Sequence, residues 1–242
     1  MDSFRADCIA LYQIAFPGEP EAFTTALFDR FYPECIRTVC ENGKPISMLF
    51  ALPYPLVTAD GVREARYLYA VATHPDHRGK GLAARLLREE AARYPVFLRP
   101  MTPSLFDFYK KIGFTPISPL LEREATAAPD NGRCRLLSKA AYSAARAALA
   151  PLPTCAPTET FLSLYEAEGG FVTCGAEAIA LYERQGALIL FKEFWGDPAL
   201  APHMAGFLGG EQLKLRYRHA DGTPFGVGIG IPADAAFLAA LD

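Results

Sequence analysis

The sequence lacks a long apolar run. Nowhere do about 18 consecutive apolar residues occur, the length that a membrane-spanning helix requires. The opening residues, MDSFRAD, carry two acidic side chains and lead into no apolar block, whereas a secretory signal combines basic residues with an apolar segment. We therefore expect a soluble chain with neither a signal peptide nor a membrane partner.

An excess of basic residues is also missing. Lysine and arginine together number 24 against 27 aspartate and glutamate residues, which gives a net charge of −3 at pH 7 and a pI near 5.9. Proteins that bind nucleic acid usually show the opposite balance, because they neutralise phosphates. The composition thus predicts no nucleic-acid partner.

Cysteine is scarce. The chain has six cysteines, at positions 8, 35, 40, 134, 155 and 174, and none forms a C-x-x-C pair. This spacing argues against a structural zinc site and a disulfide framework, and is typical of reduced, packed thiols in a cytoplasmic protein. We therefore expect a cytoplasmic protein without a metal. His74 and His77 could supply two ligands, but they flank a loop for which another role is expected below.

Apolar residues, by contrast, are plentiful. Hydrophobic residues make up 51% of the 242-residue chain and charged residues 21%, which excludes disordered and collagen-like proteins. A chain of this length buries roughly 70–75% of its unfolded surface. The length allows one large domain or two modest ones.

Prolines mark the predicted domain boundary. Residues 150–157, APLPTCAP, hold three prolines and so disfavour regular structure. We predict a catalytic domain over residues 1–145, a Pro/Ala-rich linker over 146–157, and a smaller mixed α/β domain over 158–242.

Hydrophobic periodicity predicts both helices and strands in the first part of the chain. Helices are expected at residues 8–16, 22–32 and 79–94, and strands at 35–40, 45–56, 66–73 and 96–98. The turn between the first two strands is Asn42-Gly43, a dipeptide suited to a tight hairpin.

The pattern continues to the end of the chain. Ser104 is expected to cap a short helix, with Asp107 completing a capping box and Gly113 at its C-terminal end. Strands at 114–117 and 119–125, a helix at 139–149, and a final hairpin of 212–218 with 225–231 around Asp221-Gly222 are expected to follow.

The segment richest in chemical information runs from the strand at 66–73 into the helix that follows it. Gly79 and Gly81 open this helix, whose first N–H groups lack acceptors and point to one place. Arg78 and Lys80 add positive charge, so the turn is suited to an anion. The sequence fits neither the P-loop pattern nor the Rossmann fingerprint.

Two motifs resemble those of the GNAT superfamily of acyl-CoA-dependent N-acyltransferases. The run RGKGLA, residues 78–83, matches the family's R/Q-x-x-G-x-G/A signature, and FYKKIGF, residues 108–114, is similar to its F-Y-x-x-x-G-F segment. The resemblance covers roughly residues 4–125. It implies an α/β (α+β) fold with a mixed, mostly antiparallel central sheet flanked by helices. The smaller C-terminal domain would be a degenerate second GNAT-like half, without its own cofactor loop.

The resemblance also implies roles for individual residues. The backbone of Val71, Ala72 and Thr73 would pair with the pantetheine arm of acetyl-CoA, and the amide of Val71 or Ala72 would polarise the acetyl carbonyl. The pyrophosphate would bind at Arg78, Gly79, Lys80, Gly81, Leu82, Ala83 and Ala84. The acceptor amine would attack acetyl-CoA directly, and Tyr109 would be the general acid that protonates the departing thiolate.

Two assignments stay open. Leu105, Phe108, Tyr109 and Ile112 share one apolar stripe, so spacing alone also predicts a core tyrosine at position 109. Many family members place a glutamate on the strand before the loop, where this chain has Arg66, Tyr67, Leu68 and Tyr69. The general base could be Glu64, Tyr67, Glu122, Glu34 or a water chain.

These observations predict an acetyl-CoA-dependent N-acetyltransferase that acts on a primary amine of a small molecule or peptide. The alternative is a catalytically silent CoA-binding or protein-interaction module, since the strand glutamate is missing. An aminoglycoside-type enzyme would need an acidic pocket, for which a net charge of −3 gives little support. The C-terminal domain would line the acceptor site or mediate a homodimer.

Overall fold

The computed structural model describes residues 3–166 and 169–241, which fold as two compact units. Unit 1 comprises Met1–Leu56, Val62–Thr115 and Val227–Ile231, and unit 2 comprises Val57–Gly61, Pro116–Gly226 and Pro232–Asp242. Residues 1–2, 167–168 and 242, which the predicted domains include, lie outside the described residues.

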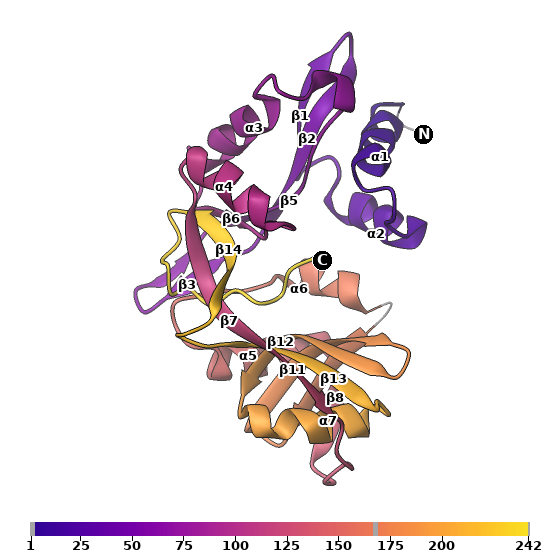
Figure 1. The fold of residues 1–242 in the computed structure, drawn as a ribbon, viewed down its shortest axis with the longest axis vertical. Coiled ribbons are helices and arrows are strands. Elements are labelled where there is room, and N and C mark those ends of the chain that lie inside the picture. The colour runs from indigo at the N-terminus through magenta and orange to yellow at the C-terminus, as the bar shows by residue number, and fades with distance from the viewer. Residues whose placement is uncertain (1–2, 167–168, 242) are drawn as a thin grey trace. The chain divides into compact units, whose positions relative to one another are not determined.

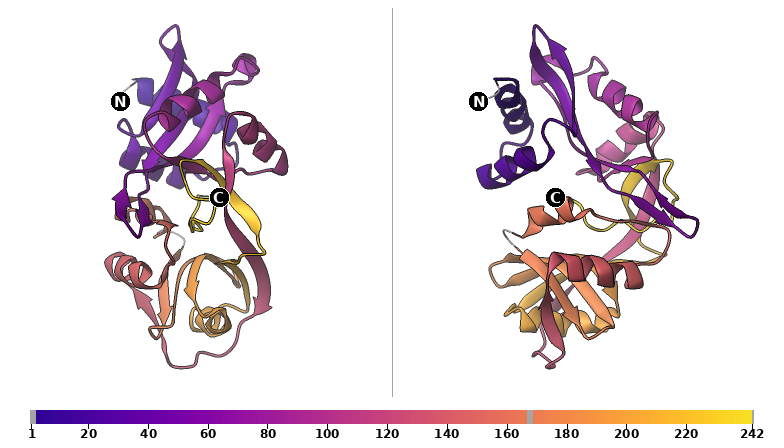
Figure 2. Two further views of the ribbon diagram at one scale, coloured as in Figure 1. Left: turned by 90° about the vertical axis from the view of Figure 1, so that its left-hand side faces the viewer. Right: turned by 180° about the vertical axis from the view of Figure 1, so that it is seen from behind.

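Unit 1 is a sheet with helices on both faces. Its helices are α1 (Ser3–Ala15), α2 (Glu21–Phe31), α3 (Leu82–Ala91) and α4 (Pro103–Lys111). Its strands follow the order β1 (Ile36–Glu41), β2 (Lys44–Pro53), β5 (Arg66–Thr73), β6 (Val96–Leu98) and the last residues of β14 (Thr223–Ile229). Only the β5–β6 pair among these described neighbours is parallel. Helices α1 and α2 lie on one side of the sheet, and α3 and α4 on the other (Figures 1 and 2).

Local sequence accounts for these elements. Asn42 and Gly43 have φ angles of 50° and 78°, as a tight turn between β1 and β2 requires. Cys8, Leu11 and Tyr12 form the buried face of α1, which packs against β2 and β5. The two short strands β3 (Leu56–Thr58) and β4 (Gly61–Arg63) follow β2 and were not predicted.

Unit 2 is built from strands that lie between helices. Its strands follow the order β7 (Thr115–Thr126), β13 (Gln212–Arg218), β12 (Leu188–Gly196), β11 (Ala178–Gln185), β10 (Gly169–Cys174) and β8 (Cys134–Leu137). Of the described pairs, β12 with β13 is parallel and the others are antiparallel. Unit 2 also contains α5 (Lys139–Leu149), β9 (Thr154–Cys155), α6 (Glu159–Leu162) and α7 (Ala201–Phe207).

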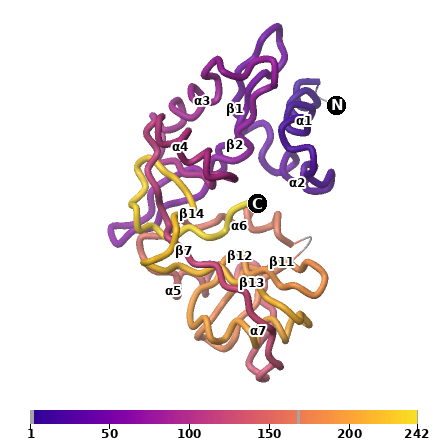
Figure 3. The backbone as a smooth tube through the Cα atoms, viewed as in Figure 1, coloured from indigo at the N-terminus to yellow at the C-terminus, as the bar shows by residue number. Residues whose placement is uncertain are grey.

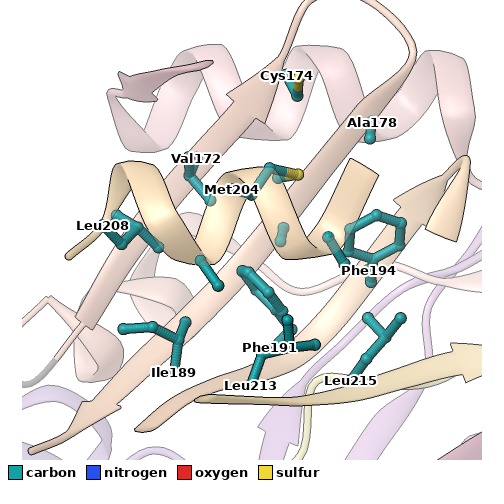
Figure 4. Packing of buried hydrophobic residues seen from close by; sticks show 13 residues of the cluster. Val172, Cys174, Ala178, Ile189, Phe191, Phe194, Met204, Leu208, Leu213 and Leu215 are labelled. Atoms are coloured by element: carbon teal, nitrogen blue, oxygen red, sulfur yellow. The ribbon is translucent and has the colours of Figure 1, made fainter. Parts of the chain in front are cut away.

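The core of unit 2 lies between its sheet and α7. Figure 4 shows Met204 and Leu208 from the α7 segment against Val172, Phe191 and Leu213 of the strands. Because strand side chains alternate between the two faces, Phe171 points to the opposite side, where it stacks on Tyr142 of α5 at 4.7 Å. The mixed α/β fold with a mostly antiparallel sheet and flanking helices is therefore confirmed.

The domain boundary differs from the predicted one. The stretch 146–157 is not a linker but part of unit 2, where Arg146 Nη2 donates to Cys155 O at 2.8 Å and Thr154 Oγ1 donates to Ala236 O at 3.1 Å. Late in the sequence the chain also returns to unit 1, where Val227–Ile229 of β14 pair with β6 (Figure 1). Strand β14 lies in the yellow part of the backbone, near the end of the chain (Figure 3). Both units are thus discontinuous in sequence. A single boundary at one proline-rich stretch cannot divide the chain into such units.

Three smaller predictions need correction. The predicted hairpin of 212–218 with 225–231 does not form, because β13 lies between β7 and β12 and offers β14 no free edge. The predicted strands 114–117 and 119–125 are one strand, β7, with Ser118 at a φ of 54°. The predicted cap of α4 is also misplaced: the helix starts at Pro103 after Thr102, and Ser104 lies inside it.

Among the residues that the structure describes, no helix has both the length and the apolar character that crossing a membrane requires.

Candidate functional site

Strand β5 of unit 1 contains a bulge. Tyr69 pairs with Phe50 and Ala72 with Met48, so two residues of β5, Ala70 and Val71, stand opposite one residue of β2. Ala70 has a φ of 52°, in the left-handed region that non-glycine residues rarely adopt. Such a bulge bends the strand and changes the direction of its backbone groups.

The bulged part of β5 has no strand partner on the β6 side among the described pairs. Strand β6 pairs in parallel with β5 only at Arg66 and Tyr67 and ends at Leu98. From residue 68 to Thr73, no described strand pairs with β5 on that side, so its outward-facing backbone groups, apart from Thr73 O, can pair with a ligand in extended conformation. The predicted binding residues Val71, Ala72 and Thr73 all lie on this open stretch.

A glycine-bearing loop follows the open stretch directly. Gly79 and Gly81 have φ angles of 76° and 74°, and a Cβ atom on either would meet no described atom within 4 Å. The first hydrogen bond of α3 runs from Arg85 N to Gly81 O at 3.0 Å, and Gly81 supplies no side-chain cap. The amides of Leu82, Ala83 and Ala84 therefore lack intrahelical acceptors, which makes this helix start suited to an anion.

Basic side chains surround the loop. Arg78 Nε donates to Thr73 O at 3.3 Å, which places its guanidinium between the strand end and the loop. Lys80 Nζ lies 3.4 Å from His77 Nδ1, and Arg85 is paired with Glu89 at 2.8 Å. The structure thus brings the predicted loop residues together with two cations, Arg78 and Lys80, that have no acidic partner among the described residues.

Tyr109 is buried in the same unit. It is 6% exposed on α4, and its ring lies 5.6 Å from that of Phe114. Gly113, at a φ of 100°, turns the chain so that Phe114 N donates to Tyr109 O at 3.1 Å. Burial raises the pKa of Tyr109 to about 12, and its hydroxyl has no hydrogen-bond partner among the described residues. The geometry therefore suits a neutral proton donor.

The carboxylates considered as the base are not poised for that role. Glu64 forms an ion pair with Arg66 and is exposed, as is Glu34. Glu122 lies in unit 2. Burial raises its pKa, but hydrogen bonds from Arg216 at 2.8 Å and Lys214 at 3.0 Å outweigh this and lower it.

Aromatic residues occupy the position where the family often has its glutamate. Tyr67 is buried and stacks on Tyr69 at 6.2 Å. The Tyr69 hydroxyl lies 3.2 Å from that of Tyr12 on α1, and burial raises the pKa of both. No local sequence pattern predicts this pair, because its two residues lie 57 positions apart in the chain.

Comparison with known proteins agrees with this geometry. The family model "Acetyltransferase (GNAT) domain" matches residues 2–117. A protein from Enterococcus faecalis V583 described as a probable N-acyltransferase has a similar fold, with a TM-score of 0.71 and 14% identity over 93% of this chain and 70% of that one.

Two further solved structures share the fold. A GCN5-related N-acetyltransferase from Anabaena variabilis has a TM-score of 0.72 and 10% identity over 94% of this chain and 70% of that one. Eis1 from Mycobacterium abscessus has a TM-score of 0.65 and 14% identity, over 97% of this chain and 70% of that one. No curated protein sequence gave a significant match. Residues 2–117 of the chain are thus similar to the acetyltransferase domain of the GNAT superfamily.

Proposed function

We propose that the protein transfers an acetyl group from acetyl-CoA to a primary amine of a small molecule or peptide. The observation that carries this proposal is the continuity of one ligand path in unit 1. The open, bulged stretch of β5 ends at Thr73, and the uncapped start of α3 follows after the loop with Gly79 and Gly81. Acetyl-CoA has an extended pantetheine arm, which suits the open stretch of β5, and a pyrophosphate, which suits the start of α3.

The chain's own groups divide the binding between them. The backbone of Val71, Ala72 and Thr73 accepts the pantetheine arm as a neighbouring strand would. The amides from Gly79 to Ala84 hold the pyrophosphate, with Arg78 and Lys80 neutralising its charge. The absence of a side chain at Gly79 and Gly81 leaves room for the phosphate oxygens to approach the backbone.

The chemistry is a direct displacement without a covalent enzyme intermediate. The acceptor nitrogen bonds to the acetyl carbon while the carbon–sulfur bond breaks, and the nitrogen loses a proton as the sulfur gains one. The amide of Val71 or Ala72 stabilises the carbonyl oxygen as negative charge develops on it. Tyr109 donates its hydroxyl hydrogen to the departing sulfur.

Two matched glycine variants test the binding site. Gly81→Glu places a carboxylate in the anion site, so calorimetry should show a roughly hundredfold or greater loss of acetyl-CoA affinity. Gly43→Glu is the control, because Gly43 also has a positive φ, 78°, and open space around it, but lies in the β1–β2 turn. Equal affinity of the two variants for acetyl-CoA would reject the assigned site.

The alternative is a CoA-binding module without transferase activity, which the ion-paired Glu64 and Glu122 favour. Release of free thiol from acetyl-CoA, measured over a panel of primary amines, separates the two functions. Acceptor-dependent thiol release supports the enzyme. Tight acetyl-CoA binding without such release supports the module.

A further inference from the structure

Two cysteines of unit 2 stand directly opposite each other on neighbouring strands. In the antiparallel pair of β8 and β10, Cys134 is the partner of Cys174. The next pair along, Arg133 and Gly175, is joined by a hydrogen bond from Gly175 N to Arg133 O at 3.1 Å. Because hydrogen-bonded and non-hydrogen-bonded pairs alternate, Cys134 and Cys174 form a non-hydrogen-bonded pair.

This register suits a disulfide. In non-hydrogen-bonded pairs the Cα atoms lie about 4.5 Å apart and both side chains project from the same face. A disulfide requires Cα atoms roughly 4.4–6.8 Å apart and Cβ atoms about 3.5–4.5 Å apart. Neither strand has to move far for the two sulfurs to bond.

A single amide holds both thiols. Asn131 Oδ1 accepts from Cys134 Sγ at 3.9 Å and from Cys174 Sγ at 3.6 Å. The Asn131 side chain is itself fixed, because its Oδ1 also accepts from Arg133 N at 3.0 Å. The loop that carries Asn131 is anchored to α7, where Ala128 N donates to Pro202 O at 3.0 Å. Both sulfurs therefore lie next to the same fixed side chain, Asn131.

The two thiols differ in access to solvent. Cys134 is half-buried on β8, the strand that ends the sheet of unit 2, whereas Cys174 is fully buried against the core beneath α7 (Figure 4). An oxidant thus reaches Cys134 first. Burial and the adjacent Cys174 raise the pKa of Cys134 to about 12, so little thiolate is present at neutral pH and the reaction is slow.

We propose that Cys134 and Cys174 are an oxidisable pair, which hydrogen peroxide converts to a cross-strand disulfide. Cys134 sulfur attacks peroxide, and a sulfenic acid and one water form. Cys174 sulfur then attacks this sulfenic acid, forms the S–S bond and releases a second water. Two thiols and one peroxide thus give one disulfide and two waters. The bond fastens the edge strand β8 to β10.

Peptide mapping under non-reducing conditions tests the proposal. The parent protein carries Cys40→Ser, because Cys40 is the exposed thiol on β1 and would link chains. After peroxide treatment, mass spectrometry should find a peptide pair linked through Cys134 and Cys174. Chymotrypsin is the suitable protease, because aromatic residues lie between Cys155 and Cys174. Tm should rise by about 5–10 °C and return with dithiothreitol.

Cys134→Ser and Cys174→Ala are the two control variants. Both should show neither the linked peptides nor the peroxide-dependent rise in Tm. Two results would overturn the proposal. One is sulfinic acid at Cys134 of the parent protein without the linked peptides. The other is a linked pair that joins Cys134 or Cys174 to a different cysteine.

Discussion

Tyr109 shows how one residue satisfies two readings of its sequence pattern. Its apolar stripe with Leu105, Phe108 and Ile112 predicts a core side chain, and the FYKKIGF motif predicts a proton donor. The structure buries the ring beside Phe114 and leaves the hydroxyl without a partner among the described residues. A buried ring whose hydroxyl forms no hydrogen bond with a described residue is compatible with a core side chain and with a proton donor. A kinetic test separates these two roles.

Tyr109→Phe should lower kcat by roughly 10²–10⁴-fold while the calorimetric affinity for acetyl-CoA stays unchanged. The ring is retained, so packing is preserved and only the donated proton is lost. Tyr94→Phe is the control, because Tyr94 also belongs to unit 1 and its ring lies under Arg66 at 4.1 Å. If Tyr109→Phe and Tyr94→Phe have the same kcat, Tyr109 is a core residue and not the proton donor.

The pH profile gives an independent test of the same phenol. Because burial raises the pKa of Tyr109 to about 12, the acid form persists through about pH 7–10 and is lost only above that range. We therefore expect no decline in kcat from this group below about pH 10. A decline below that pH that is present in the parent and absent in Tyr109→Phe would contradict the assignment.

At the scale of elements, β5 has the predicted bounds but an unpredicted shape. Apolar alternation gives a strand at 66–73, which is the observed Arg66–Thr73. The bulge at Ala70 and Val71 depends on the register against β2, and the open side depends on the shortness of β6. The bulge and the open side are properties of strand pairs, so the sequence of β5 alone does not predict them.

Two glycine substitutions in β5 should differ in their effect on stability. Ala70→Gly removes the cost of a left-handed residue, about 1–2 kcal/mol, and this offsets the backbone entropy that glycine adds. Ala72→Gly, also buried but in the regular part of the strand, should destabilise the protein by about 0.5–1 kcal/mol. Urea unfolding measures both. Equal losses in the two variants would show that the bulge is not strained at Ala70.

At the scale of the molecule, the two units repeat one topology. In unit 1, the antiparallel strands β1, β2 and β5 are followed by α3 and by β6 parallel to β5. In unit 2, the antiparallel strands β10, β11 and β12 are followed by α7 and by β13 parallel to β12. The connection before α7 has no equivalent of the glycine loop. There Asp197 Oδ1 accepts from Ala199 N at 2.9 Å and caps the short 3-10 turn Pro198–Leu200 that leads into α7.

Unit 2 also contains a buried ion pair. Arg146 on α5 donates to both carboxylate oxygens of Glu193 on β12 at 3.0 and 2.9 Å, and Tyr142 donates to the same carboxylate. Arg146 is 3% exposed and Glu193 is 0% exposed. Burial, with Glu193 alongside, raises the pKa of Tyr142. The pair connects the helix to the sheet, so its loss should affect the whole unit.

Glu193→Gln should destabilise the protein by about 3–5 kcal/mol, because it removes the negative charge that both hydrogen-bonded oxygens of Glu193 present to the buried Arg146 guanidinium. Urea unfolding followed by circular dichroism measures the change. Glu177→Gln is the control: Glu177 also forms an ion pair with an arginine of unit 2, Arg133, but is exposed, so its loss should change the midpoint little. Similar losses in both variants would show that burial does not determine the strength of these pairs.

The sequence by itself determined the parts of the site that depend on neighbouring residues. Strand 66–73, the turn with Gly79 and Gly81, and the helix after it are local, because side-chain alternation, positive φ angles and helix periodicity are properties of a few consecutive residues. Only the tertiary structure decided the rest. The division into two discontinuous units, the place of β13 between β7 and β12, the Tyr12–Tyr69 contact and the Cys134–Cys174 register all join segments distant in sequence. Long-range pairing of this kind is selected by the packing of the whole fold, which no short stretch of the chain specifies.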